Sequence, residues 1–136
     1  MDKKESIVLI DTDVLINFLD KNKKFNQIAE NAFYNFENKN IEPFVSIITT
    51  IEIIQGNKTN IEKKRILRQL EPFGNISLSD EICRITKNLI ITYSSSHGLL
   101  MGDAFIAATA LYLHIQLFTF NKKDFRFIKN LKLYEP

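Results

Sequence analysis

The sequence predicts an α/β protein with a mainly parallel sheet. Short apolar runs rich in β-branched residues alternate with longer stretches whose apolar residues recur at helical spacing. Such alternation is typical of parallel strands joined by right-handed helical crossovers. The 136 residues, 45% hydrophobic and 25% charged, have the composition of a globular protein, and we expect one domain over residues 1–136.

The first half of the chain is predicted to form two strands and four helices. Residues 6–10 are a continuous apolar run, typical of a buried parallel strand. Pro43 precedes the second strand, and Thr49 or Thr50 can cap the helix after it, which Gly56 ends. The expected strands are residues 6–10 and 44–48, and the expected helices are residues 14–19, 24–39, 52–55 and 61–70.

The second half is predicted to add three short strands and three helices. Ser79 is a good N-cap for a helix that contains Ile82 and Ile90. The serines of residues 94–98 suggest a loop, and the alanine-rich segment after it suggests a thin helix. The expected strands are residues 76–78, 116–120 and 131–133, and the later helices are residues 102–113 and 122–127.

Composition narrows the cellular setting. The net charge of +2 permits contact with nucleic acid without requiring it. The single cysteine, Cys83, excludes an internal disulfide and a cysteine zinc cluster, and its apolar neighbours suggest a buried thiol. The charged start at residues 1–5 is unlike a secretory signal, and the apolar residues 104–113 are too few to span a bilayer. We expect a cytoplasmic protein without membrane contact.

Four acidic residues stand where predicted strands give way to helices: Asp11, Glu52, Asp103 and Asp124. The carboxyl ends of parallel strands converge on one crevice, so these side chains should lie close together. Gathered carboxylates repel one another unless a cation neutralises them, and oxygen-only ligands suit Mg²⁺ or Mn²⁺. The pattern therefore predicts a divalent-metal site for phosphodiester cleavage by metal-activated water.

Each acid also has an ordinary structural explanation. Asp11 or Asp13 could cap the following helix, and Glu52 or Asp103 could be a first-turn acid favoured by the helix dipole. Asp124 could simply be solvated. The joint placement of the four acids favours function over these explanations.

Polar and basic residues near the last strand are candidates for substrate contact. Thr119 and Asn121 could orient a water or a phosphate by hydrogen bonding, and Lys122 and Lys123 could hold the phosphate backbone of a substrate. Arg126 and a basic stripe over residues 58–68 could do the same, although solvated helix faces explain both groups as well. The stripe consists of Lys58, Lys64, Arg65 and Arg68.

Four segments together resemble the PIN domain, and most closely the VapC-like toxins of bacterial toxin–antitoxin pairs. They are IDTDVLI at residues 10–16, SIITTIE at 46–52 followed by Gly56, GDAFIAATA at 102–110, and TFNKKDF at 119–125. The resemblance spans the whole chain, and the glycine–aspartate–alanine segment is its most specific part.

The resemblance implies a three-layer α/β/α fold and a Mg²⁺- or Mn²⁺-dependent endoribonuclease that forms a homodimer and is neutralised by a cognate antitoxin. It places Asp11, Glu52 and Asp103 on the acidic positions of the family, with Asn121 or Asp124 at the fourth position. Asp13 stands where relatives often carry Asn or Ser, and therefore adds one negative charge.

Two other functions compete with the nuclease. Residues 11–15 also resemble the nucleophile motif of haloacid-dehalogenase phosphatases, but Ala107 stands where that motif's second aspartate would be expected. A PIN-like module that binds RNA or antitoxin without cleaving is the other alternative.

Overall fold

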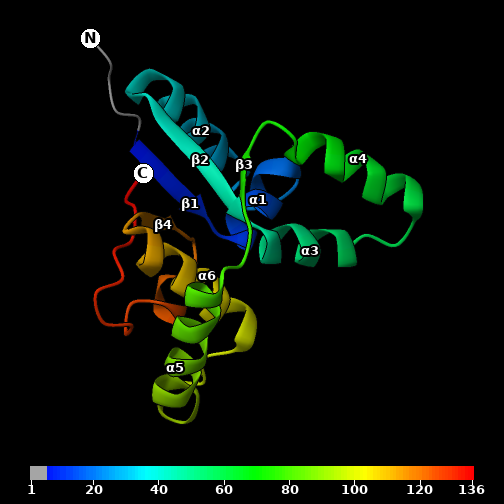
Figure 1. The fold of residues 1–136 in the computed structure, drawn as a ribbon. Helices are drawn as coiled ribbons and strands as arrows, with labels where there is room; N and C mark the ends of the chain where they lie inside the picture. Colours follow the sequence, from blue (N-terminus) through cyan, green and yellow to red (C-terminus); the bar gives the residue numbers. More distant parts are fainter. Residues whose placement is uncertain (1–5) are drawn as a thin grey trace.

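The computed structural model describes residues 6–136 and contains one four-stranded parallel sheet in the order β3-β2-β1-β4 (Figure 1). The charged start at residues 1–5 lies outside the described residues. The elements are, in chain order, β1 (Ser6–Ile10), α1 (Thr12–Leu19), α2 (Asn26–Lys39), β2 (Ile41–Ser46), α3 (Ile47–Gln55), α4 (Asn60–Leu70), β3 (Gly74–Ile76), α5 (Asp80–His97), α6 (Met101–Leu113), β4 (Gln116–Phe118) and the 3-10 helix η1 (Lys122–Asp124).

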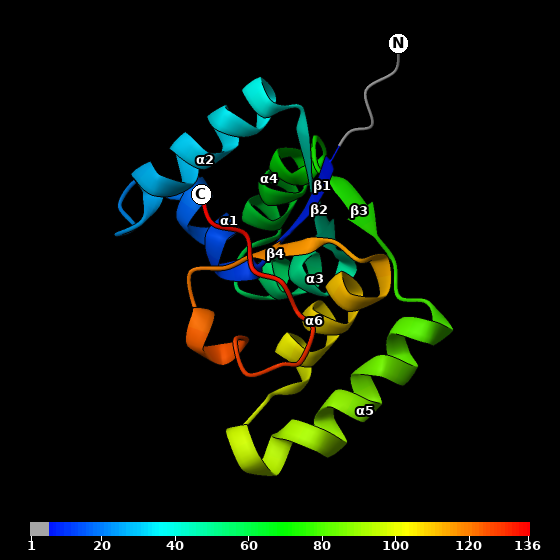
Figure 2. The same cartoon turned by 90° about the vertical axis from the view of Figure 1, so that its left-hand side faces the viewer.

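The helices cover both faces of the sheet, which confirms the α/β/α expectation. Side chains alternate along β1, so Val8 and Ile10 join one hydrophobic cluster while Leu9 joins the other. The first cluster packs the sheet against helices α1 to α4, and the second packs it against α5 and α6. Figures 1 and 2 show α2 and α5 on opposite sides of the sheet.

Parallel register carries the ends of the strands to a common edge. Leu9 of β1 pairs with Phe44 of β2 and with Leu117 of β4, and every strand pair in the sheet is parallel. Helices α1 and α3 begin directly after β1 and β2, so their first turns lie at this edge. This is the crevice where a ligand of an open α/β sheet is expected.

The start of α3 differs from the sequence-based expectation. Strand β2 begins at Ile41 and ends at Ser46, whose hydroxyl accepts a hydrogen bond from the Ile48 backbone N–H. Ser46 is therefore the N-cap, and Thr49 and Thr50 lie inside the helix. Pro43 lies inside β2, but β3 pairs with β2 only from Phe44 onwards, so one side of Pro43 has no strand neighbour.

The predicted loop at residues 94–98 is wrong, because α5 continues to His97. Gly98 ends the helix in the left-handed region, at φ 70°, which suits glycine. The serine hydroxyls do not break the helix, and Ser96 Oγ donates to the Thr92 carbonyl. Cys83 lies on the exposed side of the same helix, so the buried thiol was also wrong.

Other predicted boundaries shift by a few residues. Helix α1 begins at Thr12, α2 at Asn26 and α6 at Met101. The third strand is Gly74–Ile76, and η1 replaces the longer helix expected at 122–127. The last expected strand is reduced to one bridge between Leu117 and Leu133. No helix in residues 6–136 is both long and apolar enough to cross a membrane.

Candidate active site

The predicted acidic residues surround one open hollow of about 280 Å³ at the carboxyl ends of the strands. Asp11, Glu52, Asp103 and Asp124 all line it, together with Asn121. They come from four separate parts of the chain, on α1, α3, α6 and η1 or next to them. The expectation that these side chains share one crevice is therefore met by the geometry.

Asp11 is the most enclosed of these acids, with 5% of its surface exposed. Its Oδ1 accepts a hydrogen bond from the Thr12 backbone N–H at 2.8 Å, so it caps α1. Its Oδ2 accepts from the Thr119 hydroxyl at 2.8 Å. Burial, and after it the nearby charge of Asp13, raise the pKa of Asp11 to about 8, because the hydrogen bonds from Thr119 and Thr12 oppose this only in part. A nearby cation would favour its charged form.

Glu52 reaches the hollow from the second turn of α3. The Thr12 hydroxyl donates to Glu52 Oε1 at 2.7 Å and lies 3.0 Å from the Thr49 hydroxyl oxygen. On the other side, a Cβ on Gly102 would lie 2.8 Å from Glu52 Oε2, closer than such atoms approach. The absence of a side chain at position 102 therefore leaves space for the Glu52 carboxylate.

Asp103 lies in the first turn of α6 and lines the same hollow as Asp11 and Glu52. Burial, together with the charges of Asp124, Glu52 and Asp13, raises the pKa of Asp103 to about 6. Asp124 is the largest of these charge effects, which indicates that η1 brings Asp124 close to Asp103. Asp103 and Asp124 are therefore a pair of neighbouring carboxylates at the hollow.

Asp13 also lies at the hollow, although the sequence suggested only a possible helix cap for it. It lines the hollow with the other acids, and its Oδ1 is buried without a hydrogen-bond partner among residues 6–136. Burial raises the pKa of Asp13 as well. In the sequence, the sign of a role for Asp13 was a second aspartate on the other side of Thr12. Asp11 alone caps α1, so capping does not explain Asp13.

The residues fit a hard divalent cation. The charged groups that line the hollow, within the described chain, are five carboxylates and no basic side chain. Burial of like charges is costly without a counter-ion, and the orphaned Asp13 oxygen shows one such cost. The carboxylates are spread around the hollow. Within residues 6–136, no three acidic, histidine or cysteine side chains lie close enough together to bind one ion in their present positions.

Of the predicted substrate-contact residues, Thr119 is buried, whereas the two lysines are exposed outside the hollow. Thr119 is 2% exposed, and its hydroxyl lies between Asp11 and the Asn121 N–H, which donates to it at 3.0 Å. It therefore holds Asp11 in place. Lys122 and Lys123 are exposed and do not line the hollow, and the Lys122 ammonium binds the Glu135 carboxylate.

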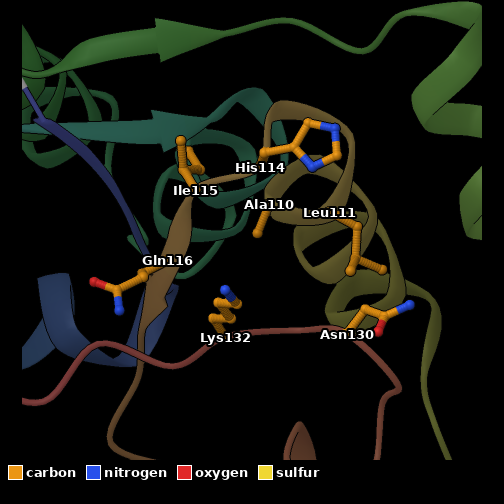
Figure 3. A pocket seen from close by; sticks show the side chains of 7 residues that line it. All are labelled: Ala110, Leu111, His114, Ile115, Gln116, Asn130 and Lys132. Carbon is orange, nitrogen blue, oxygen red and sulfur yellow. The ribbon is translucent and has the colours of Figure 1, made fainter.

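A second hollow, of about 350 Å³, lies at the other end of β4 (Figure 3). Lys132 and His114 line it, and no described acidic residue does. Figure 3 shows the amides of Gln116 and Asn130 directed to opposite sides, so these polar groups do not converge. The acidic hollow remains the candidate active site.

Comparison with known proteins places this arrangement in a family. The profile of the PIN domain matches residues 8–130. This chain belongs to the PIN domain family. The match confirms the resemblance inferred from the four segments and leaves the phosphatase alternative without support.

Full-length relatives of this PIN domain are ribonucleases by name. It is 30% identical over 139 residues to Ribonuclease VapC1 of Methanocaldococcus jannaschii, covering 99% of this chain and 92% of that protein. It is also 30% identical over 127 residues to Ribonuclease VapC10 of Mycobacterium tuberculosis, covering 93% and 91%. A solved toxin–antitoxin complex from Klebsiella pneumoniae matches with a TM-score of 0.72 at 29% identity, covering 95% of this chain and 99% of that one.

Proposed function

We propose that this PIN domain is a VapC-type endoribonuclease, the toxin of a toxin–antitoxin pair. The observation that carries the proposal is the convergence of Asp11, Glu52, Asp103 and Asp124 on one hollow of a chain that matches ribonucleases over its full length. A binding module that never cleaves RNA has no need of several mutually repelling carboxylates around one hollow, with Asp11 buried among them.

Asp11, Glu52, Asp103 and Asp124 hold Mg²⁺ or Mn²⁺ in this proposal. When bound, the cation lowers the pKa of water and stabilises charge on the scissile phosphate. The protein's own contribution is positioning: Thr119 fixes Asp11, and Thr12 fixes Glu52. Asp124 and Asn121 both line the hollow, and Asp124 fills the fourth acidic position because only it carries charge.

RNA is held by groups around the hollow and is cut into fragments with a 5′-phosphate and a 3′-hydroxyl. Asn121 lines the site and can donate to a phosphate, whereas Lys122 and Lys123 are exposed beside it on η1 and can contact the flanking backbone. Arg126 is exposed next to them. The positive charges of these lysine and arginine side chains attract RNA to an acidic site that would otherwise repel it.

The partner of the toxin is a cognate antitoxin, and the toxin itself forms a homodimer. Support for the antitoxin comes from the similarity to a toxin–antitoxin complex across nearly the whole chain. Exposed apolar side chains near the site, including Ile16, Ile51 and Met101, offer surface for protein contact.

The function is tested by adding purified protein, freed of antitoxin, to total cellular RNA with Mg²⁺, Mn²⁺ or EDTA. Discrete fragments that require the cation, and whose 5′ ends ligate without prior phosphorylation, are expected. Folded protein that binds Mn²⁺ yet leaves every RNA intact would favour the non-cleaving module.

Substituting Gly102→Ala tests the space that Glu52 requires. The added Cβ would displace the mobile end of the Glu52 side chain rather than backbone, so the melting temperature should change by only a few degrees. Cleavage should fall by roughly 10-fold or more, since supporting residues around metal ligands typically contribute that much. Gly56→Ala is the matched control, because the atoms nearest to its Cβ lie at ordinary distances of 3.5 and 3.6 Å. Equal activity in the two variants would contradict the role of Gly102.

A further inference from the structure

Asp13 is a fifth acidic residue at the hollow, and one of its two carboxylate oxygens has no hydrogen-bond partner within residues 6–136. It lies in the first turn of α1, where the N-cap position is already filled by Asp11. Its backbone carbonyl accepts a hydrogen bond from the Asn17 side chain. Its carboxylate has hydrogen-bond contacts with Asp11, with Thr119 and with the backbone of Val14 and Phe120, but no ion pair involves it in the described part of the chain. Its side chain lines the hollow from the same wall as Asp11 and Thr12.

The environment of the Asp13 carboxylate is unfavourable as it stands. Oδ1 is buried and has no hydrogen-bond partner within residues 6–136, and it is the single buried side-chain atom there of which this is true. Buried side-chain oxygens in folded proteins normally have a hydrogen-bond partner. A buried oxygen without one calls for an explanation, such as a bound ion. The carboxylate also lies near enough to Asp11 and Asp103 for its charge to act on both.

A helix-dipole role does not account for this position. Asp80 is also an aspartate in a first helical turn, at the start of α5, but it is exposed to solvent. An acid that only complements the dipole gains nothing from burial, because hydration of its charge is lost. The contrast between Asp13 and Asp80 indicates that burial beside the other acids serves a different purpose.

We propose that Asp13 is part of the cation-binding set of this protein, so that five carboxylates rather than four hold the divalent ion or ions. This inference rests on the proposed function, since it concerns the same hollow. The orphaned Oδ1 would be satisfied by the cation or by a water molecule in its shell. Asp13 acts here as a binding and positioning residue for the cation.

The test compares Asp13→Asn with the parent protein and with Asp80→Asn, the matched first-turn control. Titration calorimetry with Mn²⁺ at neutral pH gives the dissociation constant of each protein, and circular dichroism gives the metal-free melting temperature. Asp13→Asn should weaken Mn²⁺ binding by roughly 10-fold or more. Its metal-free melting temperature should stay equal or rise, because one of five repelling charges is removed.

The outcomes separate this inference from the proposed function. Mn²⁺ binding by Asp13→Asn that equals binding by the parent and by Asp80→Asn would overturn the inference, even if the parent cleaves RNA. A parent protein that binds no Mn²⁺ would overturn both. A variant that loses Mn²⁺ affinity while its circular dichroism spectrum and metal-free melting temperature are preserved supports the assignment. Asp13→Ser, which keeps a small polar side chain without charge, should weaken binding to a similar extent.

Discussion

Replacing Asp11 with asparagine is expected to abolish RNA cleavage and also to raise the melting temperature of the metal-free protein. Asparagine keeps an oxygen that can accept from the Thr12 N–H, and its amide can bond to Thr119, so the local geometry is retained. The charge is lost, and with it an anionic ligand at the centre of the site. We expect activity to fall at least about 100-fold, since a cation contributes several kcal/mol to stabilising the transition state.

The gain in stability follows from burial of the same group. Desolvation raises the pKa of Asp11 to about 8, so its charged form is disfavoured in the folded protein when no cation is present. A neutral amide avoids this cost, and the metal-free melting temperature should rise by roughly 5 °C. Thermal denaturation in EDTA and a cleavage assay with Mg²⁺ measure the two effects, with Asp80→Asn as the control. A variant that is less stable than the parent and equally active would contradict the assignment of Asp11.

Metal-free protein is expected to lose stability as the pH rises from 5 to 8. The folded-state pKa of Asp11, about 8, lies above its ordinary value of 3.8, and that of Asp103 is raised to about 6. Between the ordinary and the raised pKa the folded state binds protons that the unfolded state has released. Stability therefore falls as the pH rises through the window from about 4 to 8, and the loss is complete above it.

Melting curves at pH 5.5, 7 and 8.5, in EDTA and in excess Mg²⁺, measure this dependence. The melting temperature in EDTA should fall by roughly 5 °C or more across the series. Mg²⁺ binds the deprotonated carboxylates and should remove most of the difference by stabilising the protein at high pH. The Asp11→Asn variant should show a flatter curve in EDTA. A parent melting temperature that rises with pH in EDTA would show that these carboxyls are not buried as described.

The acidic site was predictable because it depends on chain topology. Asp11 and Glu52 follow strands that pair in parallel register, so their convergence could be expected before the structure was known. The hydrogen bonds that position them, from Thr119 and Thr12, join residues 108 and 40 positions apart. No local pattern contains such contacts, and this is why Thr119 was expected to face the substrate.

Element types were predictable from periodicity, whereas several boundaries were not. Ser46 and Thr49 are chemically similar caps, and only the length of β2 in the sheet decides between them. Polar serines at 94–96 suggest a loop in isolation, but α5 packs along α6 and continues to His97. Packing between distant elements overrides local propensity in both places.

The measurement that tests the central claim most directly is cleavage of one defined RNA by the parent protein and by Asp103→Asn, each in Mg²⁺ and in EDTA. Asp103 combines partial burial, a raised pKa and proximity to Asp124, and asparagine preserves its shape. We predict cleavage by the parent in Mg²⁺ alone, and none by the folded variant in either condition. Cleavage that persists in EDTA, or in the Asp103→Asn protein, would contradict a cation site formed by these carboxylates.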